Sequence, residues 1–205
     1  MKMKSTFPKA SLPLIAWLVT VPLSSAFAHT GNDVALGLQS GFLHPLTGVD
    51  HLVAMVAVGV WGAQLGNPAV WVLPITFPLV MAVGGLLGLL GMPLPFTEQV
   101  VALSGLALGL MVALWVRTPL WIAAVLVGIF AIFHGYAHGR ELPGAADPVA
   151  YAVGFVVATG LLHLAGILIG TITQLPAGAT VVRACGVVIG CTGLYFFLAA
   201  VGWAG

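Results

Sequence analysis

Two short clusters in this sequence contain side chains that could bind a metal ion. The first occupies residues 44–51 and the second occupies residues 133–141. Together they hold six imidazole or carboxylate side chains: His44, Asp50, His51, His134, His138 and Glu141. Imidazole combined with carboxylate suits borderline divalent ions such as Ni²⁺, Co²⁺, Zn²⁺ or Cu²⁺, whereas Mg²⁺ and Ca²⁺ are bound mostly by oxygen. The two clusters therefore predict a divalent transition-metal site.

The spacing of the first cluster allows its side chains to converge. On a helix His51 lies about 100° from Asp50, so both side chains can reach one ion. His44 precedes Pro45 and can approach from a different direction. Asp50 also has a structural interpretation, because Thr47 as N-cap with Asp50 at N3 matches a capping box. That interpretation leaves both histidines unexplained.

The second cluster has the spacing of one helix face. His134 and His138 are four residues apart and share a face. Glu141 comes seven residues after His134, which places it on the same stripe if the helix extends that far. Gly139 and Pro143 could end the helix earlier. Glu141 joins the two histidines on this face only if the helix extends past Gly139.

The composition indicates what kind of protein positions these clusters. The chain has 205 residues, of which 60% are hydrophobic and only 5% are charged. Soluble domains usually contain about 25% charged residues. We therefore predict an all-α, polytopic transmembrane helix bundle embedded in the lipid bilayer. The sequence has no basic cluster, so nucleic acid is not an expected partner, and the formal net charge of +1 is uninformative.

Turn-forming residues divide the apolar sequence into about six spans. We expect these spans at residues 47–66, 69–91, 96–116, 119–139, 147–172 and 180–203. An apolar segment at 32–43 predicts a half-helix, because about 18 Å of helix cannot cross a core of about 30 Å. Pro45 is expected to end that half-helix. Small residues four apart predict close helix crossings at Gly84/Gly88, Gly105/Gly109, Gly166/Gly170 and Gly186/Gly190.

Residues 1–28 are typical of a cleavable signal peptide, followed by a single transmembrane domain at 29–205. The segment has an N-terminal group of lysines, a short apolar stretch and an Ala26-Phe27-Ala28 cleavage site. A retained first membrane helix is the competing interpretation. Cleavage would leave His29 as the new N-terminus, where its α-amine and imidazole could chelate one metal ion. His29 could equally be only the first exposed residue.

The orientation follows from export of the N-terminus. The mature N-terminus would lie in the periplasm of a bacterial inner membrane, and six spans would place the C-terminus on the same side. Arg117 and Arg183 then fall on inner connections, in agreement with the positive-inside rule. His44 would begin an inward-running helix and His138 would end an outward-running one. Both clusters are therefore expected near the outer face.

His163 stands apart, deep in the fifth expected span. A histidine within a membrane segment needs a partner or a wet cavity. It could be a further metal ligand along a pathway, or it could form a hydrogen bond between helices.

The motifs resemble those of the HupE/UreJ family. The resemblance rests on HPLTGVDHLVAMVAVGVWG (44–62), FHGYAHGRELP (133–143) and LLHLAG (161–166), and it covers essentially the whole mature chain. The family is associated with hydrogenase and urease accessory functions and is regarded as nickel or cobalt permeases. The resemblance implies uptake of Ni²⁺ or Co²⁺ across the inner membrane. It also implies that the six residues of the two clusters are functional motif residues.

Three classes of function are compatible with the sequence. The first is a transporter that takes up Ni²⁺ or Co²⁺, with Zn²⁺ or Cu²⁺ as other occupants, and is not an enzyme. The second is a membrane metalloenzyme, for which no general base outside the ligand set is evident. The third is a metal sensor or a small-solute channel. The metal ion and the bilayer are the expected partners, and a homo-oligomer is compatible with the sequence.

Overall fold

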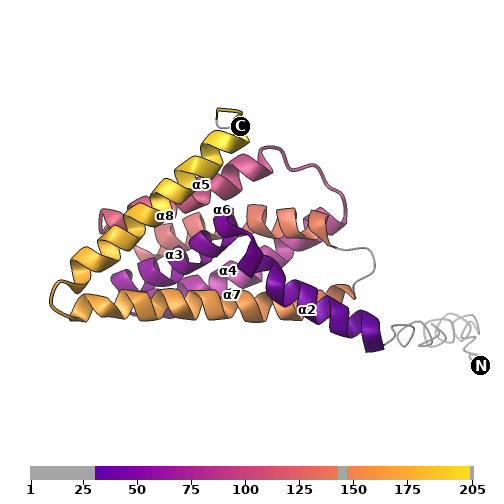
Figure 1. Ribbon diagram of the computed structural model, residues 1–205, viewed down its shortest axis with the longest axis horizontal. Helices are drawn as coiled ribbons and strands as arrows, with labels where there is room; N and C mark the ends of the chain where they lie inside the picture. Colours follow the sequence, from indigo (N-terminus) through magenta and orange to yellow (C-terminus); the bar gives the residue numbers. More distant parts are fainter. Residues whose placement is uncertain (1–30, 143–146, 204–205) are drawn as a thin grey trace, which may run out of the picture.

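Seven α-helices and one 3₁₀ helix make up residues 31–142 and 147–203, the part of the chain that this computed structural model describes (Figure 1). The helices are α2 (Gly31–Thr47), α3 (Val49–Leu65), α4 (Ala69–Leu89), α5 (Thr97–Ala113), α6 (Leu120–Glu141), α7 (Pro148–Thr171), η2 (Ile172–Gln174) and α8 (Gly178–Ala200). Helix α2 lies beside α7, and α8 crosses the bundle diagonally against α5 (Figure 1). These ranges contain no β-strand, so the predicted all-α class is confirmed.

The lengths of the helices confirm a polytopic membrane bundle. Four segments are each long and apolar enough to cross a membrane: α4, α6, α7 with η2, and α8. Helices α2 and α3 pass the same test together, but they are bent by 81° at their junction. Helix α5 is apolar and has 17 residues. The expected half-helix is thus the first arm of a bent pair.

The junction between α2 and α3 differs from the predicted one. Pro45 does not end the first helix, which continues to Thr47. A proline removes only one helical donor, and the turn closes because the Gly48 N–H donates to the His44 carbonyl at 3.4 Å. The capping box considered as an alternative interpretation of Asp50 does not form, because Gly48 is the N-cap and the Thr47 hydroxyl donates to the His44 carbonyl at 2.9 Å. His44 is therefore held in the last turn of α2, facing the start of α3 across the bend.

Glycines allow the helices that hold the second cluster to pack backbone against backbone. A β-carbon at Gly84 of α4 would fall on the Ile132 carbonyl, and one at Gly135 of α6 would fall on the Met81 carbonyl. Such contacts leave no room for any side chain at these positions. The other predicted pairs also meet neighbouring helices: Gly105, Gly109, Gly186 and Gly190 between α5 and α8, and Gly166 and Gly170 between α7 and α3. The predicted close crossings are confirmed.

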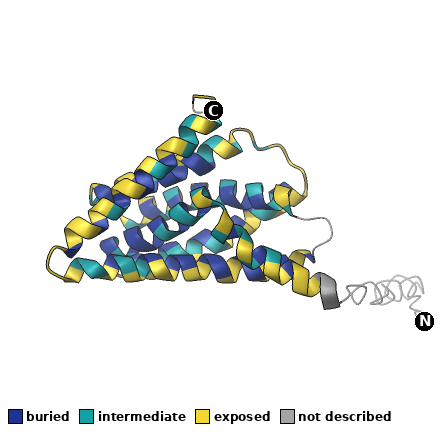
Figure 2. Ribbon diagram, in the orientation of Figure 1, coloured by how far each residue is buried: buried dark blue, intermediate teal, exposed yellow. Residues whose placement is uncertain are grey.

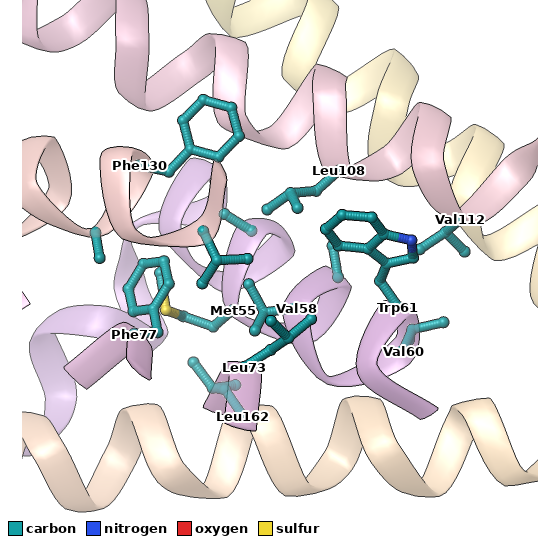
Figure 3. Packing of buried hydrophobic residues seen from close by; sticks show 14 of the residues in the cluster. Met55, Val58, Val60, Trp61, Leu73, Phe77, Leu108, Val112, Phe130 and Leu162 are labelled. Carbon is teal, nitrogen blue, oxygen red and sulfur yellow. The ribbon is translucent and has the colours of Figure 1, made fainter. Parts of the chain in front are cut away.

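The core fills the space between α3 and the helices around it. Buried residues lie on the facing sides of the helices, whereas the outer side of α8 is exposed (Figure 2). Phe77 of α4 packs near Met55 of α3, and Trp61 lies between Leu108 and Val112 of α5 (Figure 3). The Trp61 indole also donates to the Val116 carbonyl at 3.0 Å. Helix α3 is thus fixed at one end by apolar packing, and its other end is left to present polar side chains.

Candidate metal centre

The two histidine clusters meet at one end of the bundle. The bend between α2 and α3 supplies the first cluster, and the last two turns of α6 supply the second. Helix α6 extends to Glu141 without a break, so His134, His138 and Glu141 lie along one helix as the spacing predicts. The ring of His138 lies 4.7 Å from that of His44 and 4.2 Å from that of His51, measured between centroids. Residues separated by about ninety positions in the sequence therefore share one site.

Three ligand groups converge most closely. His44, His138 and Glu141 each offer one ligand atom, and these atoms all lie within 4.8 Å of one another. The Glu141 carboxylate oxygen is 3.1 Å from His44 Nε2 and 3.8 Å from His138 Nδ1. His138 is buried and Glu141 is exposed, so this group has one side in the protein and one side open. A divalent cation could enter from the open side and meet two imidazoles and a carboxylate.

His51 is oriented by its neighbour. The Asp50 carboxylate accepts a hydrogen bond from the His51 backbone N–H at 2.9 Å and lies 3.2 Å from His51 Nδ1. A carboxylate accepts only, so Nδ1 carries the proton of this contact. His51 Nε2 is buried and has no hydrogen-bond partner among the residues that the structure describes. Carboxylate–histidine pairs of this kind orient ligands in metal proteins.

His134 lies deepest among the clustered histidines and has no solvent exposure. Its ring is 4.5 Å from that of His51, in an edge-to-face arrangement. Its Nε2 is 2.8 Å from the hydroxyl of Ser104 on α5, and its Nδ1 has no hydrogen-bond partner within the described ranges. His44, His138, His51 and His134 thus form a continuous series of imidazoles that leads from the open group into the bundle.

Two cavities flank this series. One, of about 350 Å³, is lined by residues of α3, α5, α6 and α8, and the first three of these helices supply its polar residues, which include Asp50, His51, Glu98 and Glu141. The other, of about 210 Å³, lies between α4, α6 and α7 and is almost wholly apolar, with His138 in its wall. Three of the five acidic residues in the chain line the first cavity. A cation approaching from that side would meet carboxylates before it meets the imidazoles.

His163 does not join the clustered histidines. It is 1% exposed, and its ring packs 5.5 Å from that of Phe77, which lies equally close to His134. No side chain in the described part of the chain forms a hydrogen bond with either ring nitrogen. The Pro74 carbonyl, which has no helical donor because Pro78 lacks an N–H, is the backbone group that interacts with the ring. Both interpretations from the sequence, a further ligand or a contact between helices, stay open.

Two groups of residues cannot be compared between the sequence prediction and the structure: those that the structure does not describe, and those that the prediction did not name. The proposed signal peptide and His29 lie outside the described residues. Sequence reasoning missed Ser104, a lone hydroxyl in an apolar span with no signal in its local sequence. It also missed Glu98, whose rarity as an acid in an apolar chain was a usable signal.

Comparisons with known proteins identify the family. The model of the family described as "HupE / UreJ protein" matches residues 17–196. The chain is 46% identical over 163 residues to a protein named Protein HupE from Rhizobium leguminosarum bv. viciae. The aligned region covers 80% of this chain and 85% of that relative. No solved structure matches the chain. The chain belongs to the HupE/UreJ family.

Proposed function

We propose that this protein takes up Ni²⁺ or Co²⁺ across the bacterial inner membrane and so supplies metalloenzymes such as hydrogenase or urease. The observation that supports this most directly is the convergence of His44, His138 and Glu141, whose ligand atoms lie within 4.8 Å at the end of a membrane bundle. Metal-binding side chains are costly to place within a membrane and usually mark an ion pathway. Imidazole and carboxylate select borderline divalent ions, and thioether or thiolate groups suited to Cu(I) are not part of the group.

The remaining members of the two clusters would continue the path. His51, oriented by Asp50, and then His134 would receive the cation from the outer group. His163 would be a later ligand, beyond Phe77. After removal of residues 1–28, His29 would be the N-terminal residue and could capture the ion first through its α-amine and imidazole.

The direction of transport depends on the orientation of the bundle. With the mature N-terminus in the periplasm, the clustered histidines face the outside. A divalent cation that enters a cell with a negative interior gains about 4.6 kcal/mol per 100 mV, twice the value for one charge. Uptake then needs no nucleotide hydrolysis.

Transport by reconstituted protein tests this function. Purified protein is placed in liposomes that contain a metal-sensing dye, and Ni²⁺ or Co²⁺ influx is followed under an inside-negative potassium potential. We expect influx with the wild type and loss of influx with His138→Ala. The reason is that the His138 ring is the one that lies close to both His44 and His51. Val127→Ala is the matched control, since it also removes a fully buried side chain of α6 but no ligand.

The outcomes separate the candidate functions. Influx that persists in His138→Ala would remove the histidine group from the mechanism. A wild type that binds the ion but moves none would favour a metal sensor or a metalloenzyme. Movement of uncharged solutes without any metal would favour a channel.

A further inference from the structure

Ser104 makes a hydrogen bond whose direction can be assigned. Its hydroxyl oxygen is 2.6 Å from the Val101 carbonyl oxygen and 2.8 Å from His134 Nε2. A carbonyl oxygen only accepts, so the short contact to Val101 takes the single hydroxyl proton. The oxygen can then only accept from His134. His134 Nε2 therefore carries the proton.

This assignment determines which nitrogen of His134 can bind a cation. In a neutral imidazole one nitrogen donates and the other has the lone pair. With the proton on Nε2, the lone pair is on Nδ1, which is fully buried and has no hydrogen-bond partner among residues 31–142 and 147–203. A buried acceptor without a partner is costly, so this nitrogen is available to a ligand that would satisfy it.

His51 has the same arrangement with the roles of its two ring nitrogens exchanged. Asp50 accepts from Nδ1 of His51, which leaves the lone pair on the buried, unpartnered Nε2. The rings of His51 and His134 are 4.5 Å apart. Each of these adjacent imidazoles has one nitrogen occupied by an acceptor of the protein and the other nitrogen free.

We propose that Ser104 is a positioning residue: its hydroxyl holds His134 in the Nε2–H tautomer, so that His134 offers Nδ1 to a divalent cation passed on by His51. This inference rests on the proposed function for the identity of the cargo. It adds a second, inner binding position to the outer group of His44, His138 and Glu141. Ser104 touches no cation and acts through the imidazole alone.

The tautomer is tested first, in the metal-free full-length protein. Nitrogen NMR of protein with ¹⁵N-labelled histidine distinguishes a protonated from an unprotonated ring nitrogen, and His134→Ala identifies the signals of this residue. We expect the Nε2–H form in the wild type and in Ser104→Thr, which keeps the hydroxyl. In Ser104→Ala we expect a mixture of the two tautomers. Ser40→Ala, which loses a hydroxyl bonded to the Leu36 carbonyl on α2, should leave the His134 signals unchanged.

Cobalt binding then tests the consequence. Purified protein is titrated with Co²⁺ alone, and the visible spectrum reports the number and type of its ligands. We expect Ser104→Ala to weaken Co²⁺ binding by about 10–100-fold, as for other partners that orient a ligand, and to alter the spectrum. Ser104→Thr should restore both, and Ser40→Ala should match the wild type.

Each result separates this proposal from the proposed function. A wild-type His134 with its proton on Nδ1 would overturn the role of Ser104. So would a Ser104→Ala variant with wild-type Co²⁺ affinity and spectrum, while His138→Ala still abolishes binding. A wild type that binds neither Co²⁺ nor Ni²⁺ would instead overturn the proposed function, and the metal role of Ser104 would fall with it.

Discussion

His138 connects the two parts of the candidate site. Its ring lies between those of His44 and His51, and it also contacts the ring of Phe155 at 4.2 Å between centroids. Neither of its nitrogens has a hydrogen-bond partner within the part of the chain that is described. A buried imidazole that is packed tightly but left without partners is poorly explained as a structural residue. Its free nitrogens are better explained if the ring binds a passing cation.

At the residue scale, the charge of Glu141 can be tested separately from its size. Glu141→Gln keeps the shape and a hydrogen bond to His44, but it removes the negative charge from the outer group. We expect Ni²⁺ affinity to fall by about tenfold or more, at least the effect of losing a residue that only orients a ligand. Isothermal titration of the purified protein with Ni²⁺ measures this.

The neighbouring residue supplies the control for Glu141. Arg140→Gln changes the charge by one unit in the opposite sense and removes no ligand, so Ni²⁺ affinity should stay equal or rise slightly. A Glu141→Gln variant that binds Ni²⁺ as tightly as the wild type would show that the carboxylate is not a ligand.

The sequence predicted that the six side chains of the two clusters would lie near one another. It did not predict that His44, His138 and Glu141 are the three whose ligand atoms come closest. Helical spacing alone places His134, His138 and Glu141 on one stripe, and the topology of the spans brings them to the end that holds His51. The ring distances, however, depend on the bend at Gly48, whose angle no local pattern encodes. Ser104 was missed for the same reason, since its contact with His134 joins two helices that are distant in sequence.

At the element scale, the crossing of α4 and α6 sets the position of the second cluster. Gly135 lies directly after His134 and packs against the Met81 carbonyl, and Gly139 lies directly after His138 and packs against the Gly85 carbonyl. A glycine therefore follows each histidine on α6 and holds the helix against its neighbour. The distance of the imidazoles from His44 and His51 depends on that close approach.

Substitution of Gly135 tests this dependence. In Gly135→Ala the new methyl group would meet the Met81 carbonyl, so α6 must move away from α4. We expect destabilisation of about 1–3 kcal/mol, as for other overpacked positions, together with weaker Ni²⁺ binding. Unfolding of the purified protein in mixed micelles gives the stability, and titration gives the affinity.

Gly128, on the same helix, is the matched control. A β-carbon there would meet nothing within 4 Å. Gly128→Ala should therefore leave Ni²⁺ binding unchanged and should not destabilise the protein. Equal effects of the two substitutions would mean that the crossing does not set the site.

The helix boundaries show which physical signals are local. The spans expected at 69–91 and 96–116 appear as Ala69–Leu89 and Thr97–Ala113, because glycine and proline mark their ends in the sequence. Pro45 misled the same reasoning, because a proline near the last turn of a helix removes one donor without ending the helix. Pro74 and Pro78 inside α4 illustrate the same tolerance.

At the scale of the whole molecule, the bundle has two unlike ends. One end holds the imidazoles and the larger cavity, which is lined by three acidic residues and also by Phe196, Ala199 and Ala200 of the last helix. At the other end, the side chains of Gln64 and Arg183 donate hydrogen bonds to carbonyls in the last turn of α5 and so fill that end of the bundle. The C-terminal end of α8 therefore lies on the side of the site, and the loop after α3 lies on the opposite side. The side of the membrane that each end faces decides between uptake and export.

Labelling of single cysteines determines that side. In a protein whose Cys185 and Cys191 are replaced by alanine, Trp203→Cys places a thiol at the site end and Asn67→Cys places one at the opposite end; both positions are exposed. If the site faces the periplasm, a membrane-impermeant maleimide added to intact spheroplasts should label Trp203→Cys and leave Asn67→Cys unlabelled until the membrane is opened. Both variants should label after lysis, which serves as the control for reactivity. The reverse pattern would turn the histidines toward the cytoplasm, where the membrane potential would oppose exit of a divalent cation by about 4.6 kcal/mol per 100 mV, and passive uptake through this face would no longer be the function of the site.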